Sequence, residues 1–329
     1  MERSDLQIGT MTLSPPVLLA PMAGITDLPW RRLVASFGAG LVVSEMVASQ
    51  EVVQAKPLAR ARADLGFDQA ATSVQLAGRD AHWMAEAARY VAGQGARVID
   101  INMGCPAKRV TTGACGSALM KDLGHALRLI EAVVGAVDVP VTLKTRLGWD
   151  DTCLNAPQLA QMAEAAGVRM ITIHGRTRNQ FYKGQADWAA IARVKQAVRI
   201  PVIANGDITD TATARTALTL SGADGVMIGR GAQGAPWRLA QIAHDLYGTP
   251  APQIPQGADL VQMIATHYDA MLGFYGIDLG LRVARKHLGW YLDQAGLHAG
   301  RAAMMTAPTP QAALTLIAQT FGPCERRAA

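Results

Sequence analysis

Residues 102–116, NMGCPAKRVTTGACG, hold the densest group of side chains that could do chemistry. Asn102 and Cys105 lie just ahead of the basic pair Lys108 and Arg109, and a second thiol follows at Cys115. The two cysteines are ten residues apart, with no CxxC spacing and no paired histidine, so the pattern does not indicate a zinc site. From these residues alone, Cys105 could belong to a disulfide or a redox relay, or act as a nucleophile or proton donor.

Polar side chains also occur at or just after the ends of most apolar runs before residue 245. They are Glu45, Gln75, Asn102, Lys144, Arg146, His174, Arg176, Arg178, Asn205, Asp207 and Arg230. Taken singly, a buried lysine is more often half of an ion pair, and a histidine more often a satisfied core residue. Because carboxyl ends of parallel strands meet at one end of a barrel, their joint occurrence there predicts an active site.

Two glycine-containing loops, NGDIT (205–209) and GRGA (229–232), indicate a phosphate site. In parallel barrels the last two such loops, with a helix N-terminus, commonly bind phosphate, although either glycine alone could simply form a tight turn. A cofactor held there would place its ring over the barrel mouth, within reach of Gln75, Asn102, Lys144 and His174. A lysine beside the pyrimidine end of a flavin would stabilise the negative charge of its reduced form.

The elements that must position these residues are eight short apolar runs separated by helical segments. The runs lie at 17–20, 41–45, 72–76, 98–102, 141–145, 170–174, 201–205 and 225–229, with amphipathic or alanine-rich segments at 80–94, 121–137, 155–167, 188–198 and 210–221. Continuous rather than alternating hydrophobicity is typical of parallel strands buried on both faces. The pattern predicts an α/β fold, a (β/α)8 TIM barrel. A doubly wound sheet is less favoured because no GxGxxG opens the first helix.

Segments at the two ends of the chain complete the expected organisation. Residues 6–16 read as a hairpin that plugs the bottom of the barrel. The Pro/Gly-rich stretch 248–258 reads as a linker, and 259–322 shows helical periodicity without strand candidates. We therefore expect a catalytic barrel domain over 1–245 and a helical domain over 246–329.

Composition limits the class of protein. Of the 329 residues, 50% are hydrophobic and 17% charged, which excludes a disordered chain. The four cysteines, Cys105, Cys115, Cys153 and Cys324, are sparse and irregular, as in a reducing cytoplasm. Neither a signal peptide nor a membrane span is present in the sequence pattern, so we expect a cytoplasmic protein. The net charge of +5 weakly favours a polyanionic partner.

Several motifs together resemble one family. They are PMAGITD (21–27), SVQLAG (73–78), NMGCPAKRVTTGACGSALM (102–120), KTRLGW (144–149), HGRTRNQFYKG (174–184), NGDI (205–208), GRGAQGAPW (229–237) and ARKHLGWY (284–291). In this order and over nearly the whole chain, they resemble the tRNA-dihydrouridine synthases, most closely the bacterial DusB branch.

This resemblance implies an FMN-dependent enzyme that reduces the C5–C6 bond of a tRNA uridine with NADPH. The branch implies a uridine of the D loop, with position 17 favoured. Matched residue by residue, the FMN ligands are Pro21, Met22, Ala23, Gln75, Lys144, His174, Asn205, Gly206, Asp207, Gly229 and Arg230. Cys105 matches the proton donor of the family, and Asn102, Arg146 and Tyr182 match residues that contact the target uracil.

The resemblance gives Cys105 a chemical role. Hydride delivered to C6 of the uracil leaves charge that a general acid must neutralise at C5, and an ordinary thiol is mostly protonated at neutral pH. Lys108 and Arg109 would favour the thiolate if they faced Cys105, so we expect them to point toward RNA phosphate. Cys115 reads as a packed small residue in a glycine-rich loop.

The partner implied is tRNA, whose target base must be turned out of its stack. Arg146, Arg176, Arg178 and Lys183 at the barrel mouth are expected to bind the backbone around that base. In the helical domain, Arg282, Arg285, Lys286 and Gly289 share one helix face by their spacing, which could bind RNA or simply be solvated. No membrane or metal is expected, and a monomer is favoured.

Two other functions stay open at this stage. One is an FMN-dependent dehydrogenase of free pyrimidines, of the dihydroorotate type, which shares a barrel and an Asn…Cys-Pro loop but needs no helical domain. The other is a non-catalytic RNA-binding regulator. Flavin absorbance of the purified protein would count heavily against the regulator.

Overall fold

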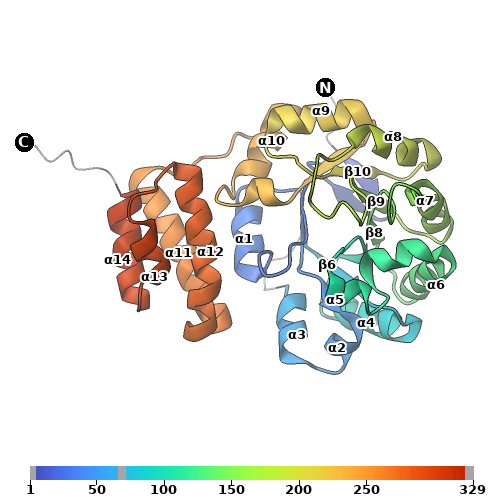
Figure 1. The fold of residues 1–329 in the computed structure, drawn as a ribbon, viewed down its shortest axis with the longest axis horizontal. Helices are drawn as coiled ribbons and strands as arrows, with labels where there is room; N and C mark the ends of the chain where they lie inside the picture. Colours follow the sequence, from blue (N-terminus) through green and yellow to red (C-terminus); the bar gives the residue numbers. More distant parts are fainter. Residues whose placement is uncertain (1–4, 66–71, 323–329) are drawn as a thin grey trace, which may run out of the picture.

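The chain forms a parallel β-barrel with a helical bundle at its side (Figure 1). The computed structural model describes residues 5–65 and 72–322. The barrel strands are β3 (Val17–Leu19), β4 (Leu41–Val43), β6 (Thr72–Ala77), β7 (Val98–Met103), β8 (Val141–Arg146), β9 (Met170–His174), β10 (Val202–Asn205) and β11 (Gly225–Ile228). They pair in parallel in the order β4-β3-β11-β10-β9-β8-β7-β6, and pairing between β4 and β6 closes the ring. The predicted TIM barrel is confirmed.

Helices cover the outside of the barrel, and five of the seven begin at an aspartate. The barrel helices are α1 (Leu28–Ser36), α4 (Ala81–Gly93), α6 (Leu123–Val134), α7 (Ala156–Ala165), α8 (Trp188–Ala197), α9 (Thr211–Ser221) and α10 (Arg238–Tyr247). The side chains of Asp27, Asp80, Asp122, Asp187 and Asp210 each accept a hydrogen bond from a backbone N–H in the first turn. Such a cap contributes about 1 kcal/mol to helix stability.

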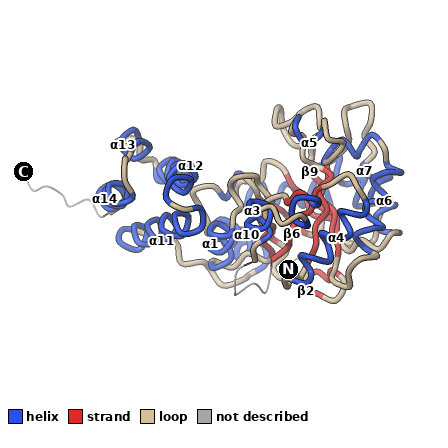
Figure 2. Tube along the Cα trace, turned by 90° about the horizontal axis from the view of Figure 1, so that it is seen from below, coloured by secondary structure: helices blue, strands red, loops and turns tan. Residues whose placement is uncertain are grey.

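Shorter elements lie mainly in the loops. They are β5 (Val47–Ala48), α2 (Ser49–Val53), α3 (Pro57–Ala63), α5 (Lys108–Thr111) and the 3-10 turns η1 (Gly116–Lys121) and η2 (Arg230–Ala232). Figure 2 shows α5 at the end of the barrel opposite β2. The α5 end is the one where the strands finish, so the loops that follow the strands form the mouth of the barrel.

The amino end of the barrel is closed by the predicted hairpin, β1 (Leu6–Ile8) and β2 (Met11–Leu13). Ile8 and Leu13 are fully buried and belong to one apolar cluster with the strand residues Val98, Met170 and Ile203. Side chains of a strand alternate between faces, so Asp100 and Asn102 follow Val98 on the inner face of β7. The interior therefore changes from apolar at the hairpin to polar at the mouth.

The C-terminal part is helical, as predicted, with α11 (Gly257–Tyr275), α12 (Ile277–Ala295), α13 (Arg301–Thr306) and α14 (Pro310–Phe321). Residues 249–256 connect it to α10 without helix or strand. The bundle packs on α1: the buried Trp30 ring lies 5.4 Å from the ring of His267 and 5.1 Å from that of His287. The hydroxyl of Tyr275 donates to Asp27 over 2.9 Å. Independent folding of the two parts stays a prediction, and Cys324 lies outside the described residues.

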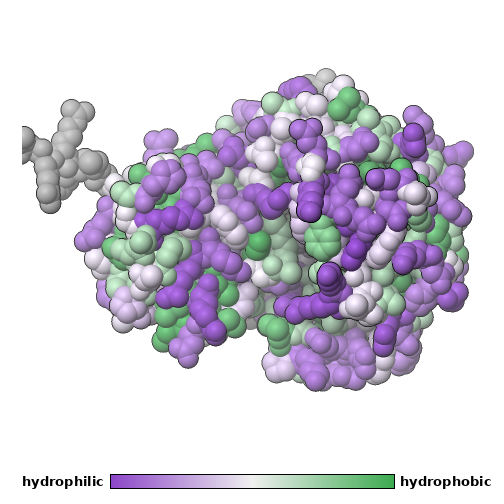
Figure 3. All heavy atoms as spheres, viewed as in Figure 1, coloured by the Kyte–Doolittle hydropathy of each residue, from purple (hydrophilic) through white to green (hydrophobic). Residues whose placement is uncertain are grey.

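The surface around these elements is mixed in character. Hydrophilic residues cover much of the face shown in Figure 3, with hydrophobic ones between them. Within the described ranges, none of the helices combines the length and hydrophobicity that crossing a membrane requires.

Candidate active site

A cavity of about 570 Å³ opens at the mouth of the barrel. In the view of Figure 3 it lies where pale and green atoms sit in a hollow bordered by hydrophilic side chains. Its lining includes every residue predicted to hold the cofactor: Pro21, Met22, Ala23, Gln75, Lys144, His174, Asn205, Gly206, Asp207, Gly229 and Arg230. Asn102, Cys105, Arg146 and Tyr182 line the same cavity. The volume suits a cofactor-sized ligand.

Cys105 is held at this mouth by its neighbours on both sides. Its backbone N–H donates to Oδ1 of Asn102 over 3.0 Å, and its carbonyl accepts from the N–H of Ser117 at 3.1 Å and from the hydroxyl at 2.9 Å. Gly116 has φ +60°, and a Cβ there would lie 2.7 Å from the Cys105 carbonyl oxygen. The glycine-rich segment after the cysteine is therefore the support on which the Cys105 loop rests.

Cys115 has no part in the cavity lining. It is half-buried, its Sγ lies 3.3 Å from the carbonyl oxygen of Gly113, and burial raises the pKa of its thiol. This placement agrees with a packing role. Lys108 and Arg109 are exposed on α5. Their predicted direction toward RNA phosphate stays a prediction.

Lys144 extends from β8 into the buried side of the cavity. Its Nζ donates to Oδ1 of Asn205 over 3.0 Å, and Nδ2 of Asn205 donates to the carbonyl of Met227 at 2.8 Å. Burial, together with the charge of Arg146, lowers the pKa of Lys144 to about 8, while Asp100 acts to raise it. At neutral pH the lysine is thus a positively charged donor, and it loses its proton at a lower pH than an ordinary lysine does.

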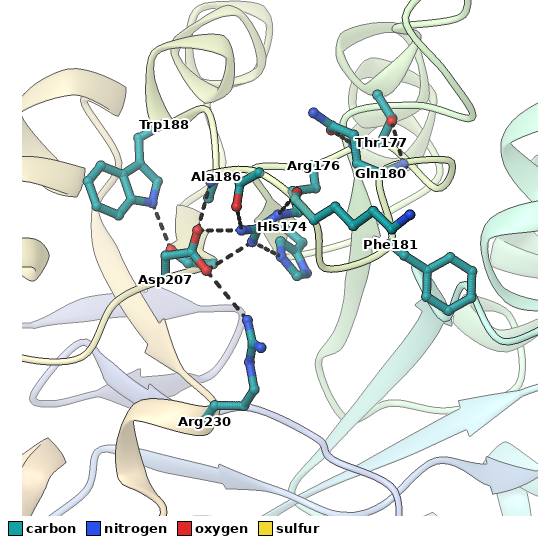
Figure 4. A network of polar contacts seen from close by, with 12 residues as sticks. His174, Arg176, Thr177, Gln180, Phe181, Ala186, Trp188, Asp207 and Arg230 are labelled. Carbon is teal, nitrogen blue, oxygen red and sulfur yellow. Dashed lines mark hydrogen bonds and ion pairs between the residues drawn. The ribbon is translucent and has the colours of Figure 1, made fainter.

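Asp207 is the centre of a network formed by His174, Arg176 and Arg230 (Figure 4). Arg176 donates to both oxygens of Asp207, at 3.0 and 2.5 Å, and the N–H of Ala186 donates at 2.8 Å. Partial burial acts to raise the pKa of Asp207, but these hydrogen bonds hold it below the usual value. The carboxylate therefore keeps its charge and fixes the loop after β10.

His174 is neutral at physiological pH because burial, followed by the charge of Lys144, lowers its pKa well below the usual value. Its Nε2 lies 3.3 Å from Nη1 of Arg176. A guanidinium can only donate, so Nε2 accepts and the ring proton lies on Nδ1.

Arg230 lies on the opposite side of the network and is mostly exposed, with 59% of its side-chain surface accessible. Its Nη2 is 3.5 Å from Asp207, and its guanidinium lies 5.2 Å from the centre of the Tyr182 ring. Within the described residues, the backbone N–H groups of Gly206, Asp207 and Gly229 donate no hydrogen bond to the protein. Free donors beside an exposed guanidinium fit a phosphate group.

Arg146 and Arg176, two of the arginines predicted to bind the RNA backbone, are buried, with 2% and 1% of their surface exposed. Arg146 donates to the carbonyls of Gly104, Thr177 and Phe181 over 2.7 to 3.1 Å. Arg176 donates to the carbonyls of Lys183 and Gly184. Both arginines therefore fix the loop 177–184 through hydrogen bonds to its carbonyls. Arg146 also lines the cavity, where it can contact a bound base.

Tyr182, from that loop, lies at the mouth with 53% of its surface exposed. The Arg146 guanidinium is 5.6 Å from its ring centre. Arg178 and Lys183 do not line the cavity. Arg178 instead lies 4.6 Å above the ring of Trp149, which Lys121 also contacts at 4.4 Å.

The basic residues of α12 have different hydrogen-bond partners. Arg282 is exposed, and its Nε donates to the carbonyl of Asp278 over 3.3 Å. Arg285 contacts the carbonyl of Ala307 at 3.5 Å. Lys286 donates to the carbonyl of Gly24 over 2.7 Å and so reaches the loop that supplies Pro21, Met22 and Ala23 to the cavity. A role in RNA binding stays a prediction. Among the described residues, Arg282 is the exposed member whose hydrogen bond goes to its own helix.

Two carboxylates that had no predicted role support the site. Glu45, which it placed at a strand end without a role, accepts from the N–H of Gly24 at 2.9 Å and from Arg62 at 3.3 Å. Asp100 is buried and accepts from Gln75 at 2.6 Å and Thr142 at 2.7 Å. A charged residue inside the apolar run VIDIN was the signal for Asp100, because such a residue needs a partner.

A family model described as dihydrouridine synthase (Dus) matches residues 18–321. The chain is 63% identical to a probable tRNA-dihydrouridine synthase of Rhodobacter capsulatus, with 98% of this chain and 99% of that protein covered. It is 46% identical to tRNA-dihydrouridine synthase B of Xanthomonas campestris pv. campestris, with 96% of each covered.

Two solved structures share the barrel. Histamine dehydrogenase from Rhizobium sp. 4-9 matches with a TM-score of 0.56 and 12% identity, over 80% of this chain and 50% of that one. A 2-naphthoyl-CoA reductase complex matches with a TM-score of 0.55 and 13% identity, over 73% and 52%. At such identities the likeness concerns the fold, and this chain spans about half of each of the two longer proteins.

Proposed function

Because the chain belongs to the dihydrouridine synthase family, we propose that it reduces the C5–C6 bond of a uridine in the D loop of tRNA, with FMN as cofactor and NADPH as reductant. Position 17 is the uridine we favour. The observation that carries the proposal is the shared cavity: Cys105 and Lys144 line it together with the loops at 205–207 and 229–230. A proton donor, a buried cation and a phosphate site thus lie around one space.

The residues present fit a flavin mononucleotide. The free N–H groups of Gly206, Asp207 and Gly229 and the exposed Arg230 would hold the phosphate. Lys144, Gln75 and His174 would contact the polar edge of the ring from the buried side. When bound, the flavin supplies the hydride for the reduction.

The protein's own part in the chemistry is to orient the base and to provide a proton. The amide of Asn102 and the guanidinium of Arg146 face the cavity and would bind the uracil edge. The thiol of Cys105 would donate its proton to C5 as C6 receives hydride, so that both carbons become saturated. The half-exposed ring of Tyr182 would cover the base and limit the access of water.

The experiment that tests this proposal measures dihydrouridine directly. Purified protein is expected to show flavin absorbance, and tRNA from a strain lacking the gene should lose one dihydrouridine by mass mapping. Unmodified tRNA incubated with the protein and NADPH should regain it. Turnover of dihydroorotate or free uracil in place of tRNA would favour the free-pyrimidine dehydrogenase, and a colourless protein that binds tRNA would favour the regulator. The enzyme is expected in the cytoplasm, where tRNA is modified.

Arg230→Ala should weaken the binding of FMN by roughly ten- to a hundredfold, the value of one charge-assisted hydrogen bond to phosphate. The side chain is exposed, so the fold should not suffer. Fluorescence titration of the protein with FMN measures the affinity. Arg193→Ala on α8 is the matched control, since Arg193 is also exposed but lies outside the cavity lining. Wild-type affinity in Arg230→Ala would remove the phosphate assignment.

Arg282→Ala should reduce the slope of log affinity for tRNA against log salt by about 1, because one phosphate contact is lost. Lys286 is unsuitable for this test because it also holds the Gly24 loop of the cavity. Filter binding or fluorescence anisotropy at several salt concentrations gives the slope, and flavin content should stay as in wild type. If the slope matches that of wild type and of Arg193→Ala, α12 presents only a solvated face.

A further inference from the structure

The interior of the barrel contains a buried carboxylate, Asp100, whose role the sequence pattern does not explain. Asp100 lies on the inner face of β7, between the apolar cluster at the hairpin and the cavity, and only 3% of its surface is exposed. It does not line the cavity. A carboxylate placed there at the cost of its hydration needs a function that an apolar residue could not serve.

Asp100 begins a chain of hydrogen bonds that ends at the backbone of the Cys105 loop. Oδ1 accepts from the hydroxyl of Thr142 at 2.7 Å, and Oδ2 accepts from Nε2 of Gln75 at 2.6 Å. Oε1 of Gln75 in turn accepts from Nδ2 of Asn102 at 2.7 Å. Oδ1 of Asn102 then accepts the backbone N–H groups of Gly104 at 3.3 Å and Cys105 at 3.0 Å.

The direction of this chain is set from both ends, because the oxygens of Asp100 accept and the backbone N–H groups of Gly104 and Cys105 can only donate. An amide can turn by half a revolution and exchange its donor and acceptor ends, so an amide's orientation is set by its partners. Because Asp100 presents an accepting oxygen, Gln75 must turn its NH2 toward it, which leaves Oε1 for Asn102. Asn102 must then turn its own NH2 toward Gln75, and its oxygen is left for the backbone of Cys105.

We propose that Asp100 is a positioning residue of the active site, whose buried carboxylate anchors the Gln75 and Asn102 amides and, through them, holds the backbone of the Cys105 loop in place. The proposal deepens the proposed function, on which it rests for the role of the loop in reducing uridine. Both amides face the cavity, so their orientation decides which edges of a ring they can bind.

Two substitutions separate the positioning role from a general effect of charge or packing. Asp100→Ala removes the acceptor, so the NH2 group of Gln75 loses its buried partner and the chain is held from the backbone end alone. Asp100→Asn keeps an acceptor for Gln75, because its Oδ1 can take the place of Oδ2 while its NH2 donates to the hydroxyl of Thr142. Ser73→Ala is the matched control: Ser73 is buried on the same face of β6 as Gln75, and its hydroxyl has no hydrogen-bond partner among the described residues.

The first readout does not depend on turnover. Full-length protein is treated with iodoacetamide, with and without added FMN, and modification of Cys105 is followed by peptide mass spectrometry. Asp100→Ala should raise the alkylation rate by about fivefold, because the loop loses one fixed hydrogen bond. Asp100→Asn and Ser73→Ala should react as wild type does. If Asp100→Ala does not fold, Asp100→Ser, which is too short to reach Gln75, replaces it.

The second readout is dihydrouridine formation. Asp100→Ala should lower kcat by roughly a hundredfold, the loss expected when reacting groups shift by about 1 Å, whereas Asp100→Asn should stay near wild type when both are measured at a pH low enough to keep Lys144 charged. Unchanged alkylation and turnover in Asp100→Ala would overturn the proposal, and so would equal losses in the Ala and Asn variants, since charge would then be the cause. A wild-type protein that forms no dihydrouridine but shows the expected alkylation pattern would refute the proposed function alone.

Discussion

Cys105→Ala is expected to slow the reduction of tRNA by roughly 10²- to 10⁴-fold, the range for loss of a general acid. The variant should bind FMN, and NADPH should bleach its absorbance at the wild-type rate. The reason is that Asn102 and Ser117 hold Cys105 at the mouth through its backbone, and Cys105 is not among the residues proposed to bind FMN. Stopped-flow measurement separates the two half-reactions. The first is bleaching of the flavin absorbance by NADPH, and the second is return of that absorbance when tRNA is added.

The matched control is Cys115→Ala, which removes the same thiol ten residues away in the supporting segment. Cys115 is half-buried outside the cavity lining, so this variant should behave nearly as wild type in both halves. Exchange of behaviour between the two variants would show that the assignment of the proton donor is wrong.

Lys144→Met should slow the bleaching of the flavin by NADPH by about 10²-fold, the usual loss when one buried donor to a developing charge is removed. Methionine fills a volume similar to that of the lysine stem, so the cavity should keep its shape. The rate in wild type should also depend on pH. Lys144, with a pKa of about 8, is charged below that pH and loses its charge above it, so the rate should fall as pH rises through about 8.

Two outcomes test this explanation. Lys144→Met should show a low rate without the fall near pH 8, because the titrating group is absent. Asp100→Asn should move the fall to lower pH, since Asp100 is a carboxylate that raises the pKa of Lys144. The bleaching rate of the wild type is to be measured at steps of about one pH unit from about pH 7 to about pH 9. A constant rate over this range would mean that the charge of Lys144 does not assist the reaction.

The sequence by itself determined the barrel and the identity of the cavity residues. The eight apolar runs became strands because continuous burial on both faces is only possible in a covered parallel sheet. Local chemistry placed the helix starts, as at Asp80 and Asp210, where a side chain accepts the first free N–H groups. Parallel pairing of consecutive strands then brought the strand ends together, so His174 and Asn205, which are 31 residues apart, are paired neighbours.

Only the tertiary structure decided where the long and the buried polar side chains point. Arg176 was expected to bind RNA, but its guanidinium turns inward to Asp207 and to the carbonyls of its own loop. Lys286 reaches Gly24, 262 positions away in sequence. The partner of such a side chain is chosen by contacts between distant segments, and no local pattern encodes them. Asp100 shows the same limit: its position marks a buried charge, but its link to Cys105 exists only once β6, β7 and β8 lie side by side.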